Sequence, residues 1–251
     1  MGMLDGKVAL VTGAGQGVGQ GIALALAAEG AKVAVTGRTL GKVERTAELV
    51  AGRGGEALAL ACDVKDDVDL ARSVAQTVAR FGGLNILVNN AQEVPMGTLN
   101  ELSEASLQAG WQSGPLATFR LMKLCYPHLK GDGSIVNLAS SAAKRWDMSG
   151  YGGYAAVKDA IRQLTRAAAC EWGQDNIRCN VILPHALSPG LKWWIEKNPE
   201  EAGKFFATIP QRYVGDCEED IGRFVAVLCS PASRYVNGQS IALDGGQAYL
   251  G

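Results

Sequence analysis

A tyrosine and a lysine stand four residues apart, at Tyr154 and Lys158, in a stretch patterned as a helix. This spacing places both side chains on one helix face. A free phenol titrates near ~10, too high for an acid or base at neutral pH. An ammonium about 4 Å away contributes on the order of 4 kcal/mol at an effective dielectric of about 20, which would lower the tyrosine pKa to about 7. We therefore predict that Tyr154 transfers a proton and that Ser141, 13 residues upstream, hydrogen-bonds the substrate oxygen.

A second set with the same spacing serves as a control. Tyr126 and Lys130 are also four apart, and Ser113 also lies 13 residues before its tyrosine. Pro127 follows Tyr126 directly, which disfavours helical geometry at the tyrosine, and Ser113 does not follow a strand. We predict that this set is structural and that the Ser141 set carries the chemistry.

A glycine-rich turn near the N-terminus predicts an anion site. It follows the apolar run Val8–Val11 and opens an alanine-rich stretch, Ile22 to Ala28. The order reads as strand, turn and helix. Glycines let the backbone approach a ligand, and the helix N-terminus favours a dinucleotide pyrophosphate, although such turns also occur without a ligand. The predicted cofactor residues here are Gly13, Gln16, Gly17, Val18 and Gly19.

The end of the next strand bears on the choice of cofactor. An acidic residue about 20 positions after the glycine turn would bind the ribose 2′-hydroxyl of NAD. The sequence here is Thr36-Gly37-Arg38-Thr39, without a carboxylate. Arg38 could pair with the 2′-phosphate of NADP, and a solvated loop arginine is the alternative. We predict NADP(H).

Short apolar runs alternate with helical patterns along the whole chain. This alternation indicates an α/β fold: one doubly wound parallel sheet of Rossmann type flanked by helices, in a single domain over residues 1–251. Leu191–Ile209 is aromatic and charged without a strand, so residues 190–212 are the predicted lid. The expected strands are Val8–Val11, Lys32–Thr36, Ala57–Ala61, Ile86–Asn89, Ser134–Ala139, Ile177–Ile182 and Ser240–Leu243, and the expected helices are Gly17–Ala28, Gly41–Val50, Val68–Phe81, Glu104–Leu124, Tyr151–Trp172 and Glu218–Cys229.

Composition narrows the function classes. A net charge of −1 gives no electrostatic reason to expect nucleic acid or an anionic membrane as a partner. No apolar stretch is long enough to span a bilayer, and the first residues lack a signal-peptide pattern. The six cysteines are scattered without a C-x-x-C pair, so we expect reduced thiols, no metal site and a cytoplasmic protein.

Together the glycine turn, the Ser/Tyr/Lys set and the element order resemble the short-chain dehydrogenase/reductase family over essentially the whole chain. The resemblance implies that Asp63 and Val64 contact the adenine and that Asn90 and Ala91 lie beside the cofactor. The resemblance also implies that Leu187 and Ser188 lie near the site where the family binds the nicotinamide carboxamide. Val236–Gln239 through Asp244–Gly246 resembles a closing strand that often packs in tetramers, so a homo-oligomer, tetramer or dimer, is expected.

Three departures from the family pattern stand out. A helix asparagine that supports a kink and a proton-relay water is replaced by Gly114, followed by Pro115. That pair would itself kink the helix and free a carbonyl for the water. Gln92 stands where the family has glycine, which brings a bulky amide near the cofactor. His185 follows Pro184 in place of glycine, either as a substrate contact or as a packing residue.

The sequence therefore predicts an NADP-dependent oxidoreductase that interconverts a carbonyl and an alcohol. Tyr154 would give the proton, Ser141 would steady the oxygen, and Lys158 would hold the ribose. A cofactor-binding protein of low turnover, acting as a sensor or assembly partner, is the alternative. A halide-eliminating relative is disfavoured because the glycine turn and the lysine are retained. A hydrophobic ketone is favoured over a sugar by residues that could equally pack in the core or an interface: Met96, Trp146, Met148 and Trp193–Phe206.

Overall fold

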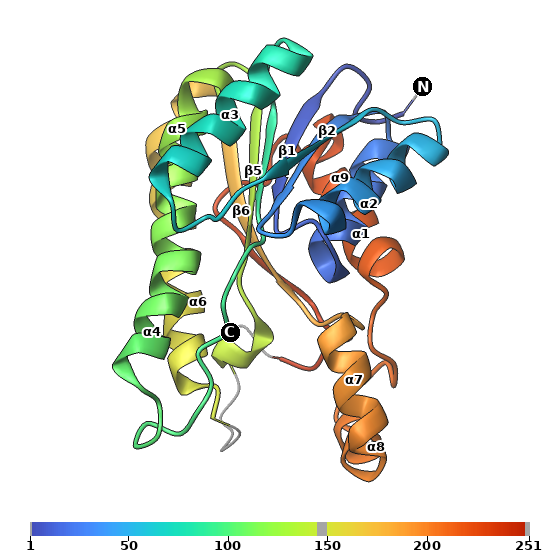
Figure 1. Cartoon of the computed structure of the whole chain (residues 1–251), viewed down its shortest axis with the longest axis vertical. Helices are drawn as coiled ribbons and strands as arrows, with labels where there is room; N and C mark the ends of the chain where they lie inside the picture. The colour runs from blue at the N-terminus through green and yellow to red at the C-terminus, as the bar shows by residue number, and fades with distance from the viewer. Residues whose placement is uncertain (1, 145–149, 249–251) are drawn as a thin grey trace.

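A computed structural model describes residues 2–144 and 150–248. A parallel sheet runs through the middle of the molecule, with its seven strands in the order β3-β2-β1-β4-β5-β6-β7 (Figure 1). The predicted α/β, doubly wound fold is confirmed. The strands are β1 Val8–Thr12, β2 Lys32–Gly37, β3 Ala57–Ala61, β4 Ile86–Asn89, β5 Gly133–Leu138, β6 Ile177–Pro184 and β7 Ser240–Leu243.

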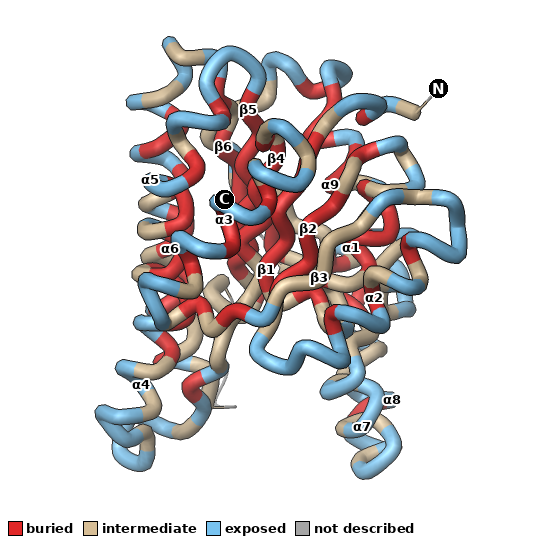
Figure 2. Tube along the Cα trace, turned by 45° about the horizontal axis from the view of Figure 1, so that its top comes forward, coloured by how far each residue is buried: buried red, intermediate tan, exposed pale blue. Residues whose placement is uncertain are grey.

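Helices cover both faces of this sheet, as parallel strands require. Along β1, Ala9 and Val11 pack in the cluster with the helices α1 (Gly17–Ala28) and α9 (Arg223–Cys229). Val8 and Leu10 pack in the cluster with α3 (Asp67–Phe81) and α5 (Ala117–Leu129). This alternation follows from the two-residue period of a strand. Figure 2 shows the resulting band of buried strands between exposed helix faces. The principal helices are α1 Gly17–Ala28, α2 Leu40–Gly52, α3 Asp67–Phe81, α4 Glu104–Trp111, α5 Ala117–Leu129, α6 Gly152–Trp172 and α9 Arg223–Cys229.

The strand order reverses between β1 and β4, and this switch point opens a crevice at the carboxyl ends of the strands. Hydrogen bonds tie the two strand ends together there. The Thr12 hydroxyl accepts the backbone N–H groups of Asn90 and Ala91, each at 3.0 Å. Asn90 Nδ2 donates back to the Thr12 carbonyl at 2.8 Å. The loops after β1 and β4 are therefore held as one unit beside the crevice.

One predicted helix needs correction. The expected helix Glu104–Leu124 is divided by a π-helical turn, Gln112–Leu116, which contains Gly114 and Pro115. Proline removes a backbone donor, so a wider turn at this point is the expected kink. A second π turn, Cys217–Gly222, precedes α9 and occupies the start of the expected helix Glu218–Cys229. The other predicted bounds are close to the observed ones.

Tyr126 lies within α5, so the helical geometry that Pro127 was predicted to disfavour does form at the tyrosine. Pro127 still removes one backbone donor, and the helix ends two residues later, at Leu129. Tertiary contacts also hold the tyrosine. Its ring centroid lies 4.9 Å from that of Trp172, and its hydroxyl lies 2.7 Å from a carboxylate oxygen of Asp175.

The aromatic segment late in the chain forms two short helices, α7 Pro189–Lys197 and α8 Pro199–Ala207. Both project beyond the carboxyl ends of the strands (Figure 1). The Ser188 hydroxyl caps α7 by accepting the N–H of Leu191 at 3.3 Å. Within the described ranges, no helix is both long and apolar enough to cross a membrane.

Candidate active site

A cavity of about 1570 Å³ lies at the switch point. The glycine turn, the loops after β2 to β6, the start of α6 and the α7–α8 segment contribute to its walls. Leu187 does not line it, and its backbone N–H pairs with the Gly215 carbonyl at 2.8 Å. The cavity brings together the other predicted site residues: Gly13, Gln16, Gly17, Val18, Gly19, Arg38, Asp63, Val64, Asn90, Ala91, Ser141, Tyr154, Lys158 and Ser188.

Tyr154 and Lys158 lie on one face of α6 at the inner wall of this cavity. Lys158 is 3% exposed, and its Nζ donates to the Leu138 carbonyl at 2.7 Å. The same Nζ lies over the Tyr154 ring, 5.5 Å from the centroid. The hydrogen bond to the end of β5 therefore holds the lysine amine in place, and α6 carries both side chains at the cavity wall.

The predicted lowering of the Tyr154 pKa is not found in this state of the protein. Burial raises the pKa of Tyr154 to about 12 and lowers the pKa of Lys158 to about 7. Desolvation penalises the charged form of each group, and it is the largest influence on both pKa values. The lysine lies over the ring face, so its charge is not directed at the phenol oxygen alone.

The serine that contacts Tyr154 is Ser140. Burial is the main influence on the Tyr154 pKa, and the hydrogen bond from Ser140 opposes it by favouring the phenolate. The Ser140 hydroxyl also accepts the N–H of Ala142 at 3.2 Å. Ser141 is 4% exposed and begins the 3₁₀ helix Ser141–Lys144. Residue spacing alone does not distinguish two adjacent serines.

The glycine turn forms a cradle that fits a dinucleotide. Gly13 and Gly17 have left-handed φ values of +63° and +59°, which disfavour a side chain. A Cβ on Gly13 would lie 2.8 Å from Asn90 Nδ2, so the turn packs tightly against the β4 loop. Gln16 precedes α1 in an extended conformation without capping it. The first N–H groups of α1 therefore suit an anion such as a pyrophosphate.

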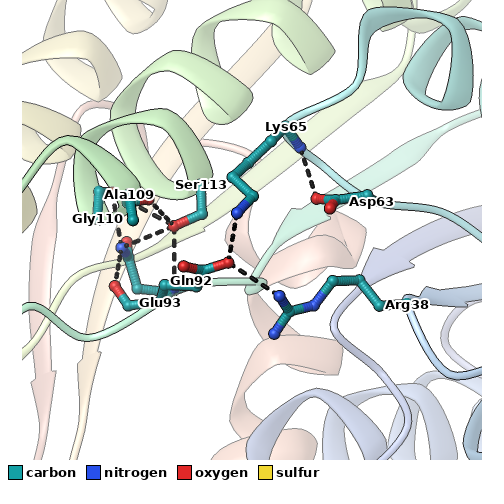
Figure 3. A network of polar contacts seen from close by, with 8 residues as sticks. All are labelled: Arg38, Asp63, Lys65, Gln92, Glu93, Ala109, Gly110 and Ser113. Carbon is teal, nitrogen blue, oxygen red and sulfur yellow. Dashed lines mark hydrogen bonds and ion pairs between the residues drawn. The ribbon is translucent and has the colours of Figure 1, made fainter. Parts of the chain in front are cut away.

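Charged side chains from the loops after β2, β3 and β4 meet beside the cavity. Arg38 Nη1 and Lys65 Nζ contact the same oxygen, Glu93 Oε1, at 2.9 and 2.8 Å (Figure 3). Lys42 Nζ donates to Gln16 Oε1 at 2.9 Å. Sequence reasoning found Arg38 but missed Lys42, Lys65 and Glu93. They come from separate elements, and no local motif signals that they meet.

Gln92 lines the cavity, but its amide points toward the π turn. Gln92 Nε2 donates to the carbonyls of Gly110 at 2.9 Å and Glu93 at 2.6 Å. The Ser113 hydroxyl accepts the Glu93 N–H at 2.9 Å and donates to the Ala109 carbonyl at 2.7 Å (Figure 3). The Gly110 carbonyl, which lies near this turn, thus accepts a side-chain amide.

Two members of the control set meet, and the third lies elsewhere. Lys130 Nζ lies 4.7 Å from the Tyr126 ring centroid, and both residues contact Asp175 at the C-terminal end of α5. Ser113 lies in the π turn and lines the cavity. Lys130 Nζ lies 3.5 Å from the Asp175 carboxylate. Tyr126 and Lys130 are absent from the described cavity wall.

Aromatic side chains form the outer wall of the cleft. The His185 and Phe205 rings meet edge to face with centroids 5.2 Å apart, and Trp194 meets Phe205 in the same way at 6.0 Å. Trp193 and Met96 also line the cavity. Trp146 and Met148, which the sequence placed in this pocket, lie outside the described residues.

The six cysteines are free thiols, and four of them are buried. In the two described ranges, no group of three or more His, Cys, Asp or Glu residues is arranged to hold a metal ion.

Comparisons with known proteins agree with this geometry. A family model described as enoyl-(acyl carrier protein) reductase matches residues 13–248. A 12α-hydroxysteroid dehydrogenase from Clostridium sp. is 40% identical, with 98% of each chain covered. A solved 7α-hydroxysteroid dehydrogenase, complexed with NADH and 7-oxo glycochenodeoxycholic acid, superposes with a TM-score of 0.91 at 32% identity, covering 97% of this chain and 94% of that one. Levodione reductase superposes with a TM-score of 0.91 at 29% identity, covering 97% and 98%.

Fold, site and relatives define an oxidoreductase that transfers a hydride between a nicotinamide cofactor and a carbonyl or secondary alcohol. The chain belongs to the short-chain dehydrogenase/reductase family.

Proposed function

We propose that this enzyme uses NADP(H) and reduces a bulky hydrophobic ketone. The observation that carries the proposal is the contact of Tyr154 with Ser140 and Lys158 at the inner wall of a cleft whose outer wall is aromatic. A proton donor at a buried position, opposite apolar rings, suits a carbonyl carried on an apolar body.

The bound cofactor would exchange a hydride at C4 of its nicotinamide. The chain's own residues move the proton. Tyr154 gives its phenolic proton to the carbonyl oxygen, and the Ser140 hydroxyl, here replacing the predicted Ser141, donates to that oxygen. Lys158 in its charged form favours the resulting phenolate, and its remaining donors hold the ribose.

The remaining predicted residues hold the cofactor. The turn at Gly13 and Gln16–Gly19 receives the pyrophosphate, Asp63 and Val64 receive the adenine, and Asn90 and Ala91 support the cofactor beside β4. Ser188 lines the cavity and is the better candidate for the carboxamide, with Leu187 beside it.

The preference for NADP(H) rests on charge. β2 ends without a carboxylate to bind a ribose hydroxyl, and Arg38 follows it. Lys42 and Lys65 add two more cations near this end of the cleft. A phosphate carries a charge of about −2 and three acceptor oxygens, so it gains more from these groups than a hydroxyl does. Titration of the protein with NADPH and NADH tests this preference, and equal affinities would refute it.

The substrate class follows from the aromatic wall and the relatives. Trp194, Phe205 and His185 form a connected group of rings that lines the same cavity as Tyr154 and Lys158. The Clostridium relative is named for action on a hydroxysteroid. Rates of NADPH oxidation should therefore be measurable with an oxo-steroid and an aryl ketone but not with a ketose. Turnover of the ketose alone would contradict the proposal, and turnover of none would favour the low-turnover sensor.

The proposal includes a homo-oligomer in the cytoplasm. Large apolar side chains remain exposed on α4 and α5: Leu107, Trp111, Phe119 and Leu124. A repeated apolar face on neighbouring helices is typical of a surface covered by another subunit.

A further inference from the structure

The most unusual charged contact of the cleft is the one around Glu93. This carboxylate follows β4, yet it reaches two cations from other loops, Arg38 after β2 and Lys65 after β3 (Figure 3). One oxygen, Oε1, receives both contacts, at 2.9 and 2.8 Å. Glu93 and Lys65 are each 29% exposed in their side chains, and Arg38 is 62% exposed.

The backbone of Glu93 is anchored independently of its side chain. Its N–H donates to the Ser113 hydroxyl at 2.9 Å, and its carbonyl accepts Gln92 Nε2 at 2.6 Å. The Ser113 hydroxyl is itself bound to the Ala109 carbonyl at 2.7 Å. The carboxylate can therefore change rotamer without moving the strand end that carries it.

We propose that Glu93 is a built-in counter-anion that occupies, between Arg38 and Lys65, the position of the cofactor's 2′-phosphate. This inference rests on the proposed use of NADP(H). The carboxylate carries one negative charge where the phosphate carries about two, so the phosphate displaces it and takes over both cations. Lys65 then becomes a second phosphate ligand beside Arg38.

Competition between the Glu93 carboxylate and the 2′-phosphate changes the relative affinities for NADP(H) and NAD(H). A cofactor without the phosphate leaves the Glu93 contacts in place, because it presents no anion to Arg38 and Lys65. A cofactor with the phosphate must first break two partly exposed ion pairs. Glu93 therefore lowers the affinity for NADP(H) but not for NAD(H), and it keeps both cations paired with an anion until the phosphate arrives.

Calorimetric titration with 2′,5′-ADP and with ADP tests this inference without requiring turnover. Glu93→Gln should bind 2′,5′-ADP about fivefold more tightly than the wild type, the expected effect of removing two partly exposed ion pairs, with ADP unchanged. Lys65→Gln should bind 2′,5′-ADP less tightly, again with ADP unchanged. Glu56→Gln is the matched control, because Glu56 also pairs with two cations, Lys32 and Arg80, outside the cleft. It should change neither affinity.

Unchanged or weaker binding of 2′,5′-ADP by Glu93→Gln would overturn the inference. An equal gain for ADP would overturn it too, since that would indicate a general charge effect. The failure of the cofactor proposal is distinguishable. If the wild type prefers NADH while Glu93→Gln still gains affinity for 2′,5′-ADP alone, the NADP assignment falls and the competition by Glu93 stands.

Discussion

Gln92 fills the space that Gly114 leaves open. A Cβ added at Gly114 would lie 3.0 Å from both Cδ and Nε2 of Gln92 and would collide with its Oε1. The two donor bonds of Nε2 fix the amide in this orientation, with Oε1 buried and without a described hydrogen-bond partner. Two departures from the family pattern are thus one compensated exchange, in which an amide reaches the π turn from the loop after β4 instead of from the helix.

This relationship predicts that Gly114→Asn is destabilising in the native background. The added side chain competes with Gln92 for one space, and overpacking of this kind costs roughly 2 kcal/mol in the free energy of unfolding. Chemical denaturation measures the loss. The double variant with Gln92→Gly should recover most of it, because the amide is then supplied by residue 114 alone.

Additive effects of the two substitutions would contradict this coupling. Gly41→Asn offers a control, since a Cβ at Gly41 in α2 meets nothing within 4 Å. That variant should show only the small propensity effect of an exposed helix position.

The cofactor preference should depend on Arg38. Arg38→Asp removes a cation and adds a carboxylate where a 2′-phosphate would bind, so the ratio of NADPH to NADH affinity should fall by about tenfold or more. Fluorescence titration of both cofactors measures it. An unchanged ratio would show that Arg38 is only a solvated loop residue.

The buried lysine predicts a pH dependence of stability. The folded-state pKa of Lys158 is lowered to about 7, so between pH 7 and about 10 the unfolded chain binds more protons at this residue than the folded protein does. The contribution of Lys158 to the free energy of unfolding therefore rises with pH between pH 7 and about 10. Relative to Lys158→Met, the wild type should gain roughly 3 kcal/mol from pH 7 to about 9.5. A pH-independent difference between the two proteins would contradict the burial of this amine.

The sequence predicted the sheet and most of the site because those features are local. Alternating apolar runs define the strands, and the glycine turn and the Tyr154–Lys158 spacing each lie within one element. The predictions that failed concern contacts between separate elements of the fold. Ser140 and Ser141 are adjacent, so only the packing of the β5 loop on α6 decides which contacts the tyrosine.

Two further features depended on contacts between distant segments. Glu93 meets Arg38 across 55 residues of sequence, and no local pattern indicates that pairing. Tyr126 stays helical before Pro127 because Trp172 and Asp175 hold it. Local propensity was outweighed in that case by tertiary packing.

The exposed apolar side chains on α4 and α5 predict a subunit interface. Trp111 and Phe119 are 48% and 42% exposed in the single chain. The double variant with Trp111→Glu and Phe119→Glu should be a monomer, because burying charged side chains in an interface is costly. Light scattering after size-exclusion chromatography measures the mass. A wild type that is already monomeric would refute the interface.

In the proposed mechanism, Tyr154 transfers the proton that accompanies hydride transfer. The direct test is the rate of NADPH oxidation with an oxo-steroid by wild type, Tyr154→Phe and Tyr126→Phe, each saturated with cofactor. We expect Tyr154→Phe to lose at least about 100-fold in turnover, because its phenolic proton is missing. Its affinity for NADPH should equal that of the wild type, because nothing else is removed. Tyr126→Phe, at the matched spacing outside the cleft, should retain its turnover. Substantial turnover by Tyr154→Phe would contradict the role of Tyr154 as the proton donor. A loss of turnover in Tyr126→Phe alone would contradict it too.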